Sequence, residues 1–191
     1  MAAIVFDIDP VHTFLGFGVR YLGISRVNGR FTRVGGMIEL DWGDLTRSAA
    51  HLRIETDSID TGNAERDAHL RSPDFLDTAR FPEMLFHSGA IRQKGGALFE
   101  IEGSLRLRGV IRPVVLEAEY GGQASDLNGI TRVGLLGRGV VDRRQFGLTW
   151  NRPLDPGAVM VGWEVELDLA IQGVRAPAAS EGRPKLEVAP S

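Results

Sequence analysis

The sequence contains no cysteine, which excludes disulfide bonds, thiolate metal ligands and thiol nucleophiles. It also has no stretch close to the roughly 20 apolar residues that a membrane-spanning helix needs, and no long run of lysine and arginine. With a formal net charge of -3, the chain lacks the basic face that nucleic acid or an anionic membrane surface would attract. We therefore expect neither nucleic acid as a partner nor integration into a membrane.

The amino terminus lacks the features of a secretory signal. It has no basic segment, and Asp7 interrupts its apolar run well before a sufficiently long hydrophobic region could form. We therefore expect a cytoplasmic protein.

Alternation of apolar and polar residues dominates the chain. Phe99, Ile101 and Leu105 fall on one side of a strand, and Glu100 and Glu102 fall on the other. Similar patterns predict eight strands, over residues 13–21, 31–42, 51–56, 84–91, 98–107, 114–120, 131–142 and 161–171. With 191 residues, of which 43% are apolar, the chain can form one domain with a substantial core.

The connections between these strands favour a barrel over a sandwich. Most are short turns, such as residues 94–96 and 108–109, and we expect the Asn28-Gly29 pair to form another tight turn. Strands joined in this way follow an up-and-down order, which closes on itself and removes exposed edges. The sequence therefore predicts an all-β fold, an eight-stranded antiparallel barrel.

One segment departs from the strand pattern. Asn63 is a good helix-capping residue, residues 64–71 favour a helix, and Ser72-Pro73 ends it. We expect a short helical insert after the third strand, followed by a second short turn over residues 74–76.

The carboxyl terminus differs in composition from the rest. From Gly173 onward alanine, proline, serine, glutamate and lysine dominate, with no sustained periodicity. We therefore predict a barrel domain over residues 1–172 and a disordered tail over residues 173–191.

The histidines give no clear sign of a metal site. His12, His51, His69 and His87 lie in different predicted elements, and no two have the spacing of a metalloprotease motif. A site assembled in three dimensions from two histidines and a carboxylate is the weaker alternative. We predict no metal and no cofactor.

Carboxylates gather in the helical insert, at Asp57, Asp60, Glu65, Asp67 and Asp74. They are interleaved with arginines, so a local network that holds loop amides and fixes the helix is favoured over an acid–base pair. We predict no catalytic residue.

Apolar side chains make the stronger positive case. Aromatic residues, Phe31, Phe146 and Trp150 among them, are numerous enough to line a barrel interior without charged residues, and such a lumen favours an apolar ligand. The strand alternation predicts the following ligand-binding residues: Phe17, Val19, Phe86, Phe99, Ile101, Leu105, Leu116, Leu135, Trp163, Val165 and Leu167.

Several short motifs together resemble the YceI-like family. They follow one order and spacing over roughly residues 5 to 172, so the resemblance is specific although no single motif is. The motifs are Asp9-Pro10-x-His12, Gly29-Arg30-Phe31, Ser58-Ile59-Asp60-Thr61-Gly62-Asn63, Arg66-Asp67-x-His69-Leu70-Arg71-Ser72, Phe81-Pro82, Phe86-x-Ser88, Arg108-Gly109-Val110 and Arg143-x-x-Phe146-Gly147.

The resemblance implies a lipocalin-like, eight-stranded antiparallel barrel whose elongated pore holds an isoprenoid chain. It also makes a homodimer plausible, and it carries over no catalytic residue. Two features depart from the family pattern: many members are exported, whereas no signal peptide is visible here, and Thr13 stands where serine is usual.

The leading hypothesis is a non-enzymatic protein that binds and sequesters or carries a polyisoprenoid, quinone-like molecule or related amphiphilic lipid. One alternative is an enzyme that acts on an apolar substrate, with His69, Asp67 or His12 as acid or base at the barrel mouth. Another is a structural or interaction module whose barrel is filled by its own side chains.

Overall fold

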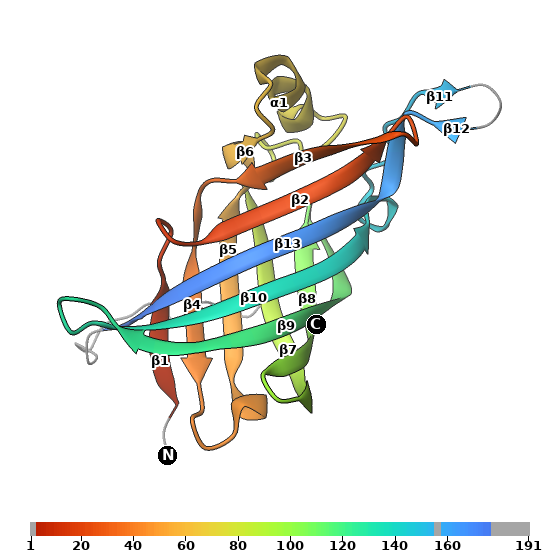
Figure 1. The fold of residues 1–191 in the computed structure, drawn as a ribbon. Coiled ribbons are helices and arrows are strands. Elements are labelled where there is room, and N and C mark those ends of the chain that lie inside the picture. Colours follow the sequence, from red (N-terminus) through yellow and green to blue (C-terminus); the bar gives the residue numbers. More distant parts are fainter. Residues whose placement is uncertain (1–2, 155–157, 177–191) are drawn as a thin grey trace.

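The computed structural model describes residues 3–154 and 158–176. Within them the chain forms one large sheet, a small hairpin and a single α-helix (Figure 1). The long strands are β1 (Ile4–Ile8), β2 (Phe14–Tyr21), β3 (Ser25–Phe31), β4 (Val34–Leu40), β5 (Ala49–Glu55), β7 (Glu83–Gly95), β8 (Leu98–Leu107), β9 (Val110–Ser125), β10 (Thr131–Asp142) and β13 (Val161–Arg175).

The remaining elements are short. The helix α1 spans Ala64–Arg71, and single turns of 3₁₀ helix occur as η1, η2 and η3. Their bounds are η1 (Leu45–Arg47), η2 (Thr56–Ser58) and η3 (Arg143–Phe146), and the short strands are β6 (Ile59–Asp60), β11 (Pro153–Leu154) and β12 (Ala158–Val159).

The large sheet closes into the predicted eight-stranded antiparallel barrel. The wall of the barrel has eight strand positions, here called staves. Two staves are each made of two consecutive strands, β1 with β2 and β3 with β4. The other six are β5, β7, β8, β9, β10 and β13. Closure occurs at β13, which pairs with β10 on one side and with β1 and β2 on the other. The up-and-down order and the helical insert after the third stave are thereby confirmed.

The N-terminal strand β1 was not among the predicted strands. Phe6 is fully buried and Ile8 nearly so, and Phe6 lies opposite Ile38 on β4 and Arg175 on β13. A strand of five residues next to Asp9-Pro10 has too few alternating positions to stand out in the sequence.

The expected turn at Asn28-Gly29 is wrong. Both residues lie inside β3, and the chain instead reverses through Leu22 and Gly23, whose φ angles of 53° and 72° are left-handed. Gly29 serves packing, because a Cβ at this position would lie 2.4 Å from the Phe17 ring. An Asn-Gly pair therefore does not mark a turn here.

The domain boundary after residue 172 also falls inside an element. β13 continues to Arg175, and Gly173 pairs with Ile8. Residues 173–175 therefore belong to the barrel, and the predicted tail from residue 177 onward lies outside the described residues.

The helix α1 lies over one end of the barrel (Figure 1). As predicted, Asn63 caps it by accepting a hydrogen bond from the Arg66 amide at 2.9 Å. Asp67 is buried and accepts hydrogen bonds from the amide and hydroxyl of Thr61 at 3.0 and 2.6 Å. Arg71 donates to the Ile59 carbonyl at 2.6 Å. These bonds fix the insert against the barrel, which is the structural role predicted for Asp67.

A charged network joins the strand break between β1 and β2 to β10. The Asp9 carboxylate accepts hydrogen bonds from Arg132 at 2.5 Å and makes a 2.8 Å contact with His12. Arg132 also bonds Asp126 at 3.0 Å. Burial by itself would raise the pKa of Asp9, but hydrogen bonds from His12, Arg132 and the Val11 amide lower it to about 2.

We predict that Asp9→Asn destabilises the fold at neutral pH by roughly 1–2 kcal/mol. Because the pKa of Asp9 is lower in the folded than in the unfolded state, its contribution is complete above about pH 4 and is lost as the pH falls toward 2. Urea unfolding between pH 7 and 3 measures this, with the exposed Asp168→Asn as control. The prediction would be contradicted if the difference in unfolding free energy between wild type and Asp9→Asn stayed the same as the pH falls to 3.

Candidate functional site

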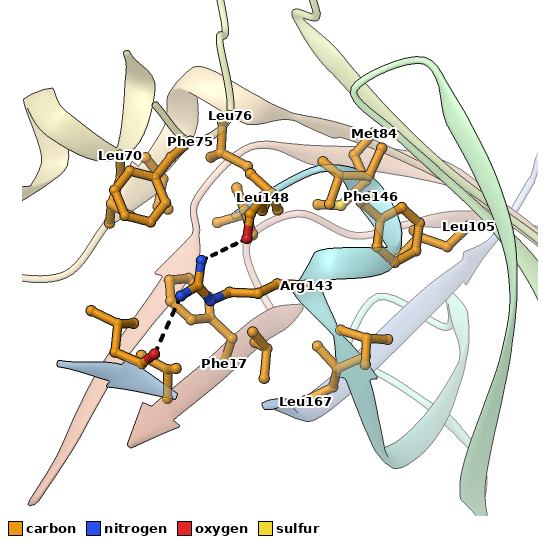
Figure 2. Close-up of a pocket in the computed structure, with 17 residues that line it drawn as sticks. Phe17, Leu70, Phe75, Leu76, Met84, Leu105, Arg143, Phe146, Leu148 and Leu167 are labelled. Carbon is orange, nitrogen blue, oxygen red and sulfur yellow. Dashed lines mark hydrogen bonds between the residues drawn. The ribbon is translucent and has the colours of Figure 1, made fainter. Parts of the chain in front are cut away.

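The barrel contains three apolar cavities in series along its axis. The helix-end cavity, of about 160 Å³, lies beneath α1 and the segment that follows it (Figure 2). Its lining comes from seven strands, from α1 and η3, and from the loops that follow these two helices. The lining residues are Phe17, Val19, Phe31, Ile59, Leu70, Phe75, Leu76, Met84, Leu105, Leu107, Val141, Arg143, Phe146, Leu148, Val161, Val165 and Leu167.

A central cavity of about 90 Å³ follows directly, since Phe17, Met84 and Leu105 line both spaces. Phe86 and Leu116 are among the other residues around it. Near the opposite end of the barrel lies the far-end cavity of about 40 Å³. Its lining includes Phe99, Ile101, Ala118, Tyr120 and Leu135.

The helix-end cavity adjoins an open groove of about 540 Å³, here called the mouth groove. The two spaces share Phe17, Val19, Leu70, Phe75 and Val161. Polar residues stand around this apolar base, namely Tyr21, Thr61, Asn63, Glu65, Arg66 and His69. The mouth groove is therefore amphipathic, with a polar border and an apolar path that leads inward.

His69 occupies a defined position in the mouth groove. Its ring packs edge-on against Phe75 and Trp150, with centroids 5.0 and 4.7 Å apart, and its Nε2 lies 3.0 Å from the Asp74 carboxylate. The other two residues named for an enzymatic role are placed differently. Asp67 bonds Thr61 as described above, and His12 bonds Asp9 away from these cavities.

Most of the residues predicted to line the interior do so. Ten of the eleven border the three cavities, so strand alternation placed them on the inner face. Trp163 is the exception: its ring stacks against the guanidinium groups of Arg143 and Arg144, at 4.5 and 5.2 Å from the ring centroid. The register between β2 and β13 is irregular between Val161 and Val165, which disturbs the alternation there. Ligand contact by the ten remains a prediction.

The expectation of an interior without charged residues is wrong, because Arg143 lines the helix-end cavity while only 4% exposed. Its guanidinium donates to the carbonyl oxygens of Gly162, Leu148, Trp150 and Val161, at 2.9, 2.6, 3.0 and 3.2 Å. Burial lowers the pKa of Arg143 from the usual arginine value. The side chain ties the loop after η3 to the start of β13 (Figure 2).

Several lining residues come from loops rather than strands. Phe75 and Leu76 follow α1, and Phe146 and Leu148 lie at and just after η3. All four are less than a tenth exposed. No periodicity in the sequence identifies which loop side chains turn inward.

Comparison with known proteins agrees with this architecture. The model of the YceI-like domain matches residues 6–173. The chain belongs to the YceI-like family. It is 36% identical over 171 residues to a UPF0312 protein from Shewanella denitrificans, which covers 90% of this chain and 86% of that one. It is also 36% identical over 169 residues to protein YceI from Salmonella arizonae, with 88% and 85% covered.

Solved structures of YceI-like and related proteins share the fold. BcnA from Burkholderia cenocepacia superposes with a TM-score of 0.76 at 18% identity, over 86% of this chain and 98% of that one. A polyisoprenoid binding domain from Saccharophagus degradans, implicated in plant cell wall breakdown, has a TM-score of 0.64 at 16% identity, over 91% and 99%. Among residues 3–154 and 158–176, no helix has the length and apolarity to cross a membrane.

We predict that Arg143→Met destabilises the protein by roughly 2–4 kcal/mol, because four carbonyl groups then lose their donor in a buried position. The neighbouring Arg144→Met is a matched control: Arg144 is half exposed and bonds Asp142 on the surface, so its loss should cost less than about 1 kcal/mol. Urea unfolding of both variants measures the difference. Equal losses would mean that the buried hydrogen bonds contribute little.

Proposed function

We propose that this chain binds one long isoprenoid chain or a related amphiphilic lipid inside its barrel. The observation that carries the proposal is the series of apolar cavities that reaches the surface at the mouth groove. An apolar chain gains about 25 cal/mol for each Å² that it removes from water. An eight-stranded barrel has room for one slender ligand.

The class of ligand is inferred from the shape of the interior and from the family. The polyisoprenoid binding domain from Saccharophagus degradans has the same fold, which supports a polyisoprenoid or a quinone with an isoprenoid chain as the cargo. The three cavities together approach the lower end of the roughly 300–1,000 Å³ typical of ligand pockets. A long chain therefore requires side chains between the cavities to move, and the flexible Met84 borders both the helix-end and the central cavity.

We infer that the apolar chain lies inside and the polar head group remains at the mouth groove. Thr61, Arg66 and His69 stand on the groove border, where a polar head would keep its hydrogen bonds while the chain is buried. The opposite orientation would place a polar head against the apolar lining of the central cavity.

The proposed role is binding rather than catalysis. Asp67 and Arg66 are engaged in hydrogen bonds that hold the insert, and His69, on the border of the mouth groove, contacts the Asp74 carboxylate. A carrier or a store for the lipid fits an interior whose lining is almost entirely apolar.

The direct experiment is organic extraction of the natively purified protein, followed by mass spectrometry. We expect a stoichiometric isoprenoid lipid or quinone. An empty extract, together with failure to take up added polyprenol, would overturn the proposal and favour a barrel filled by its own side chains.

We predict that Leu167→Trp lowers the retained lipid at least tenfold. Leu167 borders both the helix-end and the central cavity, so a larger ring obstructs the path between them. The matched control is Val140→Trp, since Val140 lies on β10 and is 55% exposed. Lipid content of the two variants is compared by mass spectrometry, after circular dichroism has verified that both fold. Equal retention would place the lipid elsewhere.

We predict that His69→Ala leaves the chemical identity of a bound isoprenoid unchanged, because binding needs no proton transfer. The wild type and the variant are each incubated with a polyprenol, and the recovered lipid is analysed by mass spectrometry. A product formed by the wild type and absent with His69→Ala, in a folded variant, would support the enzymatic alternative instead.

A further inference from the structure

A pair of histidines lies on the outer wall of the barrel, away from the cavities. His51 on β5 is directly opposite His87 on β7 in the register of the two strands. The same row continues to Met37 on β4 and Ser104 on β8. Side chains in one such row project from the same face of the sheet, so this row presents imidazole, thioether and hydroxyl groups together.

The inner face of the same strand pair is apolar. Leu52 lies opposite Phe86 in the register, one position along from the histidines, and both residues line the central cavity. Because successive side chains of a strand point to opposite faces, the histidines face outward. The pair is therefore separate from the proposed lipid site, and the inference does not rest on the proposed function.

The two imidazole rings are close enough to share a proton. Their Nδ1 atoms are 2.7 Å apart, the ring centroids are 5.0 Å apart and the ring planes meet at 63°. Burial, the neighbouring His51 and the charge of Arg106 lower the pKa of His87. The nitrogen of an imidazole that carries no proton is the atom that binds a metal ion.

The separation of the two nitrogens suits a particular coordination geometry. Imidazole nitrogens bind a transition-metal ion at about 2.0–2.1 Å, so two of them are about 2.9 Å apart at a right angle and about 3.4 Å apart at a tetrahedral angle. The observed 2.7 Å is a hydrogen-bonding distance, and it has to widen less to reach the right-angled arrangement than to reach the tetrahedral one. Tetragonal sites favour Cu²⁺ or Ni²⁺, and Cu²⁺ has the higher affinity for nitrogen ligands.

We propose that His51 and His87 form a surface site for Cu²⁺ in which both Nδ1 atoms bind the ion and water completes the coordination. The ion replaces the shared proton, which moves to Nε2 of the donating ring, so each ring keeps one proton. Residues 3–154 and 158–176 contain no cluster of three or more histidine, aspartate or glutamate residues arranged to hold a metal. The site therefore has two protein ligands and open positions.

The test is a titration of the intact protein with copper sulfate in a buffer that contains glycine as a competing chelator, followed by electron paramagnetic resonance. We expect one tetragonal Cu²⁺ with two equatorial imidazole nitrogens in the wild type. His51→Gln and His87→Gln should each weaken binding at least tenfold and leave one imidazole. The control is His12→Gln, because His12 bonds Asp9 elsewhere on the surface, and it should match the wild type.

Two results would overturn the proposal. One is a wild-type spectrum without paired imidazole nitrogens, which needs no variant and so does not depend on how the variants fold. The other is unchanged copper binding in the folded double variant His51→Gln, His87→Gln, which would place the ion on other ligands.

Discussion

The barrel depends on the pairing of β13 along both of its edges. One edge pairs with β10 over eleven residue pairs, Arg132 with Val174 through Asp142 with Glu164, and the other pairs first with β2 and then with β1. This pairing joins β10 to β1 and β2 and so closes the wall of the barrel. It also fixes the face of every side chain, because a slip of one residue would turn the whole apolar set of a strand outward. The cavities therefore depend both on the closure of the barrel and on the register of its strands.

Glycine and aromatic residues divide the enclosed space. A Cβ at Gly103 would lie 2.5 Å from the Phe86 ring, and one at Gly29 would lie 2.4 Å from the Phe17 ring. The glycines thus allow the two rings to lie flat against neighbouring strands. Phe17 and Phe86 both border the central cavity, so their positions determine how far the interior is continuous. At Gly29 and Gly103, a glycine within a strand thus serves ring packing.

The sequence determined the barrel more fully than it determined the ends of the barrel. Strand alternation identified the staves and most inward residues, because half-buried strands have a strict period of two. The same rule could not place Phe75, Phe146 and Leu148, since a loop has no period and its packing depends on tertiary contacts. The prediction of a turn at Asn28-Gly29 was wrong for a related reason. The glycine there leaves space for the Phe17 ring, and this tertiary contact overrides the local preference for a turn.

Arg143 shows how a charged residue can line an apolar cavity without making it polar. Burying a guanidinium is unfavourable unless its donors find partners, and here the partners are carbonyl oxygens of Leu148, Trp150 and the start of β13. The donors are therefore turned toward the backbone, and the surface offered to the cavity is largely the aliphatic stem. The prediction of an uncharged lining is wrong for Arg143, but the lining is still apolar, as that prediction implied. The guanidinium holds the loop after η3 against the start of β13, and the apolar helix-end cavity lies beside it.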